Sequence, residues 1–270
     1  MKMPRYILLA VSLIVFGASL VPSVVAQDAP AGGAAPAGGG RAGRGGGGRG
    51  GGGRGGGGGG GATRGAPIPE TAHSIMPVTT PVAQPDSDGF IPRWLILEPI
   101  PCNGNVTDNA VQATVKQEWF PNQLTVMPKD GDKVTSNGAE YIWHAVDTKN
   151  YNVDLCHFGY FLGKNTSNAI FWGLTVVNCP EELKNVRLAA GSNSATVWWV
   201  NGKEVVDIYG DIQTTVDDGV SKRLTLKKGA NVIRVALVNN GGQTDFCARI
   251  LDEQGNPVKN FTVTLSDSGR

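Results

Sequence analysis

From Phe90 onward the sequence repeats one pattern: a short segment of alternating apolar and polar residues, followed by a signal for a tight turn. Alternation with period two is typical of β-strands. Nine segments carry this pattern: residues 93–99, 140–146, 168–177, 185–190, 195–200, 203–208, 221–227, 231–238 and 244–252. Turn-forming pairs such as Asn201-Gly202 and Asp218-Gly219 stand between several of them. The pattern predicts an all-β domain over residues 89–270, a β-sandwich of jelly-roll type.

One stretch within this domain favours a helix. Val111 and Val115 are four positions apart between residues 108 and 118, so they would share one helical face. About 180 residues follow Phe90, which is enough chain for one substantial core. We therefore expect a single domain with many strands and one short helix.

The N-terminus has the pattern of a secretory signal. Lys2 and Arg5 precede an apolar run over residues 7–20, and small residues end the segment at Ala26. A membrane anchor is the alternative, but the apolar run is too short to span a bilayer comfortably. We expect residues 1–26 to be a signal peptide cleaved before Gln27. The mature protein would then be secreted, periplasmic or on the cell surface of a bacterium, and not an integral membrane protein.

Residues 27–66 consist mainly of glycine, alanine and proline, and this composition cannot bury enough apolar surface to fold. We expect a disordered tether, followed by an extended Pro/Thr-rich segment over residues 67–88. Its five arginines are Arg41, Arg44, Arg49, Arg54 and Arg64. No aromatic residue interleaves them, and the part from Ala66 onward has 17 Lys and Arg against 22 Asp and Glu. Nucleic acid is therefore not the expected ligand, whereas weak attraction to an anionic envelope surface is compatible with the tether.

The four cysteines, Cys102, Cys156, Cys179 and Cys247, all follow the tether. In an oxidising compartment they predict two disulfides, for which three pairings are possible, and buried free thiols are the alternative. The histidines are too scattered to suggest a metal site.

Motifs for catalysis are absent from the sequence. It has no G-x-S-x-G elbow, no phosphate-binding loop and no dinucleotide fingerprint. Asp207, Asp211, Asp217 and Asp218 cluster between predicted strands, so a bound calcium ion is possible, but their spacing fits no defined calcium loop. We expect a protein that is not an enzyme and needs no cofactor; an esterase or a glycosidase is the less favoured alternative.

Five stretches occur in an order seen in a known family: WLILEPI (94–100), AIFWGLTVV (169–177), ATVWWVNGKEVV (195–206), LTLKKGANVIRVALV (224–238) and FCARILDEQGNPV (246–258). Over residues 90–265 the chain resembles galactose-binding-like β-sandwich modules, similar to the sugar-binding domain of glycoside hydrolase family 2, in secreted bacterial proteins. It departs from them at LEPI, where a Gly-Pro-Phe is expected, and in its four cysteines. The resemblance implies a non-catalytic carbohydrate-binding module on a tether. The alternative is a structural or adhesive surface protein whose sandwich mediates protein–protein assembly.

The hairpin around Asn201-Gly202 locates the candidate site. A two-residue type I′ turn would place Trp199 opposite Glu204 and Trp198 opposite Val205. One face would then be the core face, with Ala195, Val197, Trp199, Val206 and Ile208. The other face would carry Trp198 beside Lys203 and Asp207. The predicted glycan-binding residues are Trp198, Lys203, Asp207, Tyr209 and Arg234. The alternative is that Trp198 is covered by a loop or by residues 100–140.

Overall fold

The computed structural model describes residues 74–210 and 213–266. The predicted signal peptide, the tether with its arginines and Asp211 lie outside these residues. Within the described ranges, no helix is long and apolar enough to cross a membrane.

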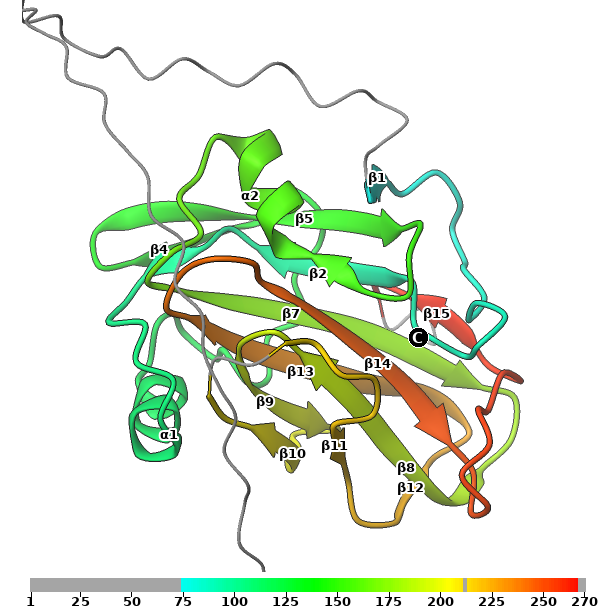
Figure 1. Cartoon of the computed structure of the whole chain (residues 1–270). Helices are drawn as coiled ribbons and strands as arrows, with labels where there is room; N and C mark the ends of the chain where they lie inside the picture. Colours follow the sequence, from blue (N-terminus) through cyan, green and yellow to red (C-terminus); the bar gives the residue numbers. More distant parts are fainter. Residues whose placement is uncertain (1–73, 211–212, 267–270) are drawn as a thin grey trace, which may run out of the picture. The chain divides into compact units, whose positions relative to one another are not determined.

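Two antiparallel sheets face each other in a β-sandwich, as the alternating pattern predicts (Figure 1). The larger sheet has the strand order β1 (Ile75–Pro77), β5 (Ala139–Thr148), β2 (Arg93–Leu97), β7 (Ala169–Cys179), β13 (Gly229–Asn239), β9 (Ala195–Val200) and β10 (Lys203–Ile208). Three short strands join it: β3 (Ile100–Pro101) and β15 (Thr262–Thr264) pair with β7, and β4 (Lys133–Ser136) pairs with β5.

The smaller sheet has the order β11 (Gly219–Val220), β8 (Leu183–Ser192), β14 (Asp245–Leu251) and β6 (Val153–Asp154), with β12 (Leu224–Leu226) paired to β8. The helix predicted around Val111 and Val115 is confirmed as α1 (Asp108–Lys116), and both valines are buried. A second helix, α2 (Leu155–Leu162), was not predicted, because its sequence is apolar on nearly every side.

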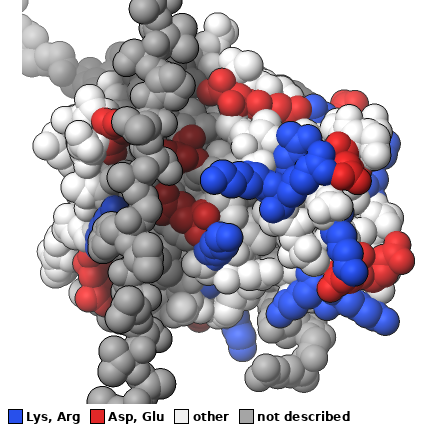
Figure 2. Space-filling model, turned by 90° about the horizontal axis from the view of Figure 1, so that it is seen from below, with Lys and Arg blue, Asp and Glu red and all other residues white. Residues whose placement is uncertain are grey.

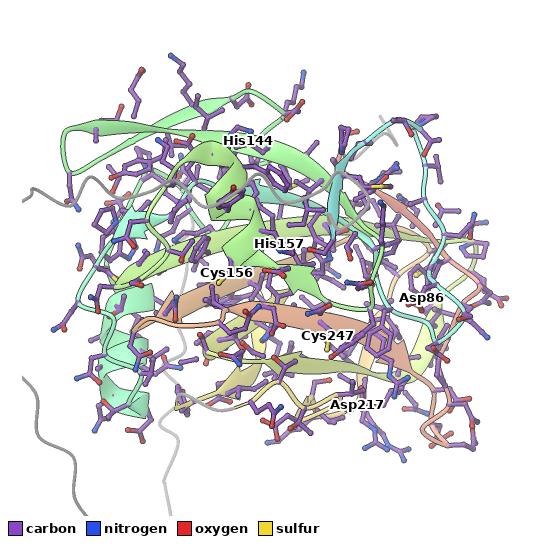
Figure 3. All side chains as sticks on the ribbon, turned by 45° about the horizontal axis from the view of Figure 1, so that its top comes forward. Asp86, His144, Cys156, His157, Asp217 and Cys247 are labelled. Carbon is purple, nitrogen blue, oxygen red and sulfur yellow. The ribbon has the colours of Figure 1, made fainter. Side chains whose placement is uncertain are left out.

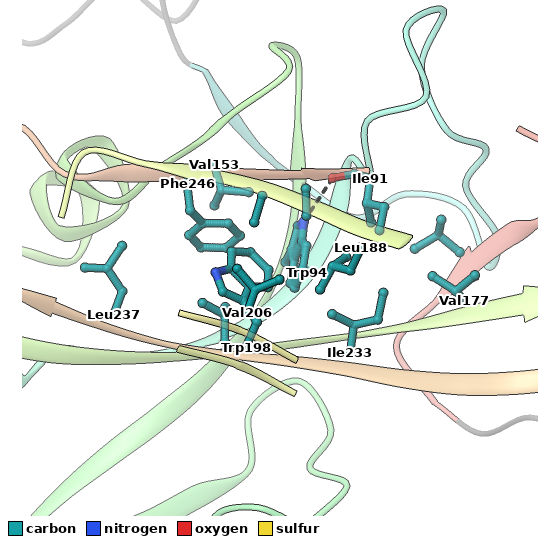
Figure 4. Close-up of a cluster of buried hydrophobic side chains, with 14 of the residues drawn as sticks. Ile91, Trp94, Val153, Val177, Leu188, Trp198, Val206, Ile233, Leu237 and Phe246 are labelled. Atoms are coloured by element: carbon teal, nitrogen blue, oxygen red, sulfur yellow. Dashed lines mark hydrogen bonds between the residues drawn. The ribbon is translucent and has the colours of Figure 1, made fainter. Parts of the chain in front are cut away.

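Large aromatic side chains fill the space between the sheets, which we call the inter-sheet core (Figure 4). Trp94 and Trp198 meet edge to face with ring centroids 6.0 Å apart, and Phe246 packs on both. The indole N–H of Trp94 donates a hydrogen bond to the carbonyl oxygen of Ile91 at 2.9 Å, so this buried polar atom is satisfied.

The opposite face of the larger sheet is buried as well, by a second group that we call the outer cluster. Trp143, Trp172 and Trp199 belong to it on the sheet, and α1 with Trp119 and Phe120 covers them. Phe120 contacts Trp143 and Trp172 edge to face at 6.0 and 5.8 Å. The larger sheet therefore has two apolar faces.

The predicted register of the β9–β10 hairpin was wrong beyond its first two pairs. Val200 does face Lys203 and Trp199 does face Glu204, but Trp198 faces Val206, because the register shifts between Glu204 and Val206. This irregularity inserts Val205 as an extra residue in β10.

The predicted core face was therefore wrong in part. Trp198, Val200, Val206 and Ile208 lie in the inter-sheet core, whereas Ala195, Val197 and Trp199 lie in the outer cluster. Trp198 is 0 % exposed. The alternative prediction was that a loop or residues 100–140 cover Trp198. Trp119 and Phe120 of that segment instead pack in the outer cluster, to which Trp199 belongs.

Replacing Trp198 tests this arrangement. Trp198→Ala removes a large aromatic from a packed core, so we expect the free energy of unfolding to fall by about 3–5 kcal/mol in urea denaturation. The matched control is Val220→Ala, at a side chain 41 % exposed on β11, which should change stability by less than about 0.5 kcal/mol. Equal stabilities of the two variants would contradict the described register.

Candidate binding groove at the edge strand

A groove of about 330 Å³ lies on the described surface between β10 and the start of β12. Residues 203–207 line one side and residues 222–224 line the other. β10 is the last strand of the larger sheet, whereas β12 belongs to the smaller one, so the groove lies where the two layers diverge. Its volume is at the lower end of the range of about 300–1,000 Å³ typical of small-molecule sites.

The groove combines charged groups with an apolar floor. Lys203, Lys222 and Asp207 are exposed, and none of them forms an ion pair with another described residue. Val205 and Leu224 are half-buried between them. Figure 2 shows the face seen from below, on which basic and acidic side chains gather.

Two further charges of the groove already have partners. The Arg223 guanidinium forms an ion pair with Glu253. The Glu204 carboxylate accepts a hydrogen bond of 3.2 Å from the side-chain amide of Gln112 on α1. The groups left for a ligand are therefore the ammonium groups of Lys203 and Lys222 and the exposed carboxylate of Asp207, which also interacts with the Tyr209 hydroxyl.

Of the five residues predicted to bind glycan, the structure brings only Lys203 and Asp207 together in this groove. The placement of Trp198 on the ligand face was wrong, because its indole is enclosed in the inter-sheet core. Tyr209 is half-buried against the outer cluster, and its hydroxyl accepts a hydrogen bond of 2.8 Å from the Gln112 amide.

Arg234 is also remote from the groove. It is 4 % exposed and donates to the carbonyl oxygen of Val126 and, at 3.4 Å, to the sulfur of Met127. Burial lowers the pKa of its guanidinium to about 10. Arg234 therefore fixes the segment that covers the outer cluster, and it does not present a charge to solvent.

Lys222, Arg223 and Leu224 were missed as site residues. They reach the groove because Leu224 pairs with Val186 across the smaller sheet. No sequence motif predicts the pairing of these two strands. The predicted single strand over residues 221–227 is in fact a loop followed by the three-residue strand β12.

Exposed aromatic rings, which would favour sugar binding by stacking, are few on the described surface. All six tryptophans are buried. The exposed aromatic side chains among the described residues are Tyr151, Tyr160 and Phe161, and none of them lines the groove. A sugar in the groove would therefore contact aliphatic side chains.

One cluster resembles catalytic machinery in its residue types. Ser74 Oγ lies 2.6 Å from His157 Nδ1, and Asp154 Oδ2 lies 3.1 Å from the same nitrogen. A serine triad needs the serine and the carboxylate on opposite ring nitrogens, so this geometry cannot relay a proton from Ser74. Within residues 74–210 and 213–266, no group of three His, Cys, Asp or Glu side chains could hold a metal ion. Asp217 of the predicted acidic cluster is paired with Arg249.

Comparisons with known proteins do not assign the chain to a family. No family model matches it, and no curated protein matches it. Ten chains of solved structures match it, and three of them illustrate the similarity in fold. The PA14 sugar-binding domain from an RTX adhesin has 12 % sequence identity and a TM-score of 0.38, over 63 % of this chain and 96 % of that one.

The second is a β-glucosidase from Kluyveromyces marxianus, with 16 % identity and a TM-score of 0.36, over 64 % of this chain and 20 % of the enzyme. The third is the PA14 domain of the MpAFP antifreeze protein, with 11 % identity and a TM-score of 0.34, over 63 % of this chain and 89 % of that one. Two of the three are named PA14 domains, whereas the sequence resembles galactose-binding-like modules. These similarities go no further than the β-sandwich.

The four cysteines are free in the structure, contrary to the predicted disulfides. Cys179 lies in the inter-sheet core, whereas Cys102 packs against the outer cluster. Cys247 lies next to Gly191 of β8, and Cys156 lies on α2, where its thiol donates to the carbonyl oxygen of Gly242 at 3.3 Å. Figure 3 shows Cys156 and Cys247 apart. Each thiol thus has its own surroundings, and burial raises the pKa of all four.

Thiol titration tests this result. Protein purified from an oxidising compartment without reductant should release four thiols in denaturant. In the folded state at pH 8, Cys179, whose pKa is raised to about 11, holds roughly one thiolate in a thousand, so a disulfide reagent should label it slowly. Cys247, with a pKa of about 12, should be slower still, and the half-exposed Cys102 and Cys156 should react first. Fewer than four thiols in denaturant would instead support the predicted disulfides.

Proposed function

We propose that the protein is a non-catalytic carbohydrate-binding module whose glycan lies in the groove beside β10. The observation that carries the proposal is the composition of this groove, in which two exposed ammonium groups and an exposed carboxylate flank an aliphatic floor. A sugar ring has hydroxyl groups at its rim and an apolar C–H face. Lys203 and Lys222 can donate to its oxygens, Asp207 can accept from its hydroxyls, and Val205 with Leu224 can contact the C–H face.

The expected export and tether agree with this role. A module that binds sugar without converting it acts by location, and a flexible arm lets it search for polysaccharide around its attachment point. The arginines of the tether would add weak, salt-sensitive attraction to an anionic envelope. These features lie in the sequence outside the described residues.

One observation favours the alternative, a structural protein that assembles through its sandwich. β10 is an edge strand, and a free edge can pair with a strand from another molecule. Light scattering of the purified protein separates the two proposals, since assembly predicts a concentration-dependent mass and glycan binding does not.

Two single substitutions test the groove. Asp207→Asn and Lys203→Gln each remove one charged hydrogen-bonding group, so each should weaken binding to the preferred polysaccharide about tenfold in affinity electrophoresis. Both side chains are exposed, so the melting temperature should not change.

The matched control is Lys228→Gln, an exposed lysine that does not line the groove. It should bind as the wild type does. If the wild-type protein bound none of a broad panel of neutral and acidic polysaccharides, glycan binding would be refuted. If both groove variants bound the polysaccharide as tightly as the wild type, the glycan would lie elsewhere on the protein.

A further inference from the structure

The charged residues of β10 are sorted between the two sides of the strand. Lys203 lies opposite Val200, which belongs to the inter-sheet core, so Lys203 projects toward the smaller sheet. The partners of Glu204 and Asp207 in β9 both belong to the outer cluster. Residues directly opposite each other in an antiparallel pair project to the same side of the sheet. β10 therefore presents its cation to one side and its two carboxylates to the other.

The irregularity at Val205 produces this separation. Side chains alternate along a regular strand, so without an extra residue Asp207 would project to the same side as Lys203. The inserted Val205 reverses the alternation, which is one way in which a bulge re-aims a side chain. It also keeps Val206 in the inter-sheet core. As a result, both carboxylates of β10 lie on the side away from Lys203.

The opposite wall of the groove is basic as well. Lys222 and Arg223 stand just before β12, which pairs with β8 of the smaller sheet. The Arg223 guanidinium is compensated by the Glu253 carboxylate. Lys203 and Lys222 are both exposed, and neither forms an ion pair with any described residue. Two uncompensated ammonium groups therefore lie on opposite walls of one groove.

The two carboxylates of β10 have contacts on their own side of the strand. Glu204 accepts a hydrogen bond of 3.2 Å from the side-chain amide of Gln112 on α1. Asp207 interacts with the hydroxyl of Tyr209, which packs against the outer cluster. These contacts keep both carboxylates on the side of α1. The groove thus has a basic rim toward the smaller sheet and an acidic rim toward α1.

Two cations on opposite walls suit a ligand that brings one anionic group. A carboxylate has two oxygens that accept charge-assisted hydrogen bonds, so it can bridge Lys203 and Lys222. A hexuronate residue carries its carboxylate on ring carbon C5, and the hydroxyls on C2 and C3 lie on the far side of the ring. With the carboxylate between the lysines, these hydroxyls lie on the side of Asp207, and the C–H face contacts Val205 and Leu224. A neutral sugar would leave both ammonium groups without a counter-charge.

We propose that the groove selects polysaccharides that contain hexuronate residues, and that Lys203 and Lys222 are the residues that recognise the carboxylate. This inference rests on the proposed glycan-binding function and names the class of sugar that the same site takes. A polyanion without sugar rings would engage the two lysines, but it would leave Asp207 and the aliphatic floor without a role.

Matched ligands separate the carboxylate from the rest of the sugar. Polygalacturonate and its methyl ester have the same backbone and ring hydroxyls, and they differ in the charge of the carboxyl group. Calorimetry on the chain from Gln27 onward should show at least about tenfold tighter binding of the acid than of the ester. The difference should shrink as salt is added, because both ammonium groups are exposed. An excess of polyaspartate in every titration masks the arginines of residues 41–64, which attract any polyanion.

Single substitutions assign the preference to the two lysines. Lys203→Gln and Lys222→Gln should each weaken binding of the acid about tenfold and leave binding of the ester nearly unchanged. Asp207→Asn should weaken both ligands alike, because it removes an acceptor for hydroxyl groups. The matched control is Lys228→Gln, which removes the same charge outside the groove and should bind both ligands as the wild type does. All four side chains are exposed, so the melting temperatures should agree.

Three results would overturn the inference. Equal affinity for the acid and the ester, with both weakened by Asp207→Asn, would leave the glycan site in place and remove its preference for charge. A preference for the acid that is as strong in Lys203→Gln and Lys222→Gln as in Lys228→Gln would assign the recognition to other residues. Displacement of polygalacturonate from the groove by polyaspartate would identify a simple polyanion site. Failure of every polysaccharide to bind would instead refute the proposed function, and this inference with it.

Discussion

The pairing of β7 with β13 is the interaction on which the rest of the structure depends. All eleven residues of each strand are in register, from Cys179 opposite Gly229 to Ala169 opposite Asn239. β2, β3 and β15 pair with β7, and β9 pairs with β13, so this ladder fixes the position of every neighbour in the larger sheet. Both strands are buried on both faces, because the smaller sheet covers one face and α1 with Trp119 and Phe120 covers the other. A sheet enclosed in this way tolerates little change in register, since a slip of one residue would exchange the two aromatic layers.

Burial on both faces also explains which predictions succeeded. Strand positions could be read from apolar content and turn signals, and α1 from the spacing of two valines. The inward face of β9 could not be read, because all six residues of ATVWWV are buried and alternation carries no information there. The irregularity at Val205 then shifted the pairs that follow. Lys203 and Asp207 line the same groove because they belong to one hairpin. Lys222 and Leu224 could not be added, since only the pairing of β12 with β8 brings them near, and that contact is remote in sequence.

Segments outside the sheets are held by arginines rather than by apolar contact alone. Arg93, 1 % exposed, donates two hydrogen bonds of 2.7 Å to the Asp147 carboxylate and two more to Thr80, which fixes the strip of chain that follows β1. Arg249 pairs with Asp217 and lies 4.9 Å from the ring centroid of Phe90, so it joins the entry to the domain with the loop before β11. Arg234 acts likewise on Val126 and Met127, through neutral acceptors. Planar guanidinium groups suit this role because each makes several directed hydrogen bonds at once.

The two surfaces with unassigned chemistry lie at the two ends of the larger sheet. Its path begins at β1, beside an apolar hollow lined by residues of β1, β5 and α2, and ends at β10, beside the groove. Seven strands at about 4.8 Å spacing separate these ends by at most about 29 Å along the sheet. The edges of a sheet are where its apolar layers stop being covered, so side chains there can meet a ligand without disturbing the core. If ligands bind at the edges of the sheet, the residues of the β7–β13 ladder contribute only to packing. This accounts for the burial of every tryptophan in a protein that we propose binds sugar.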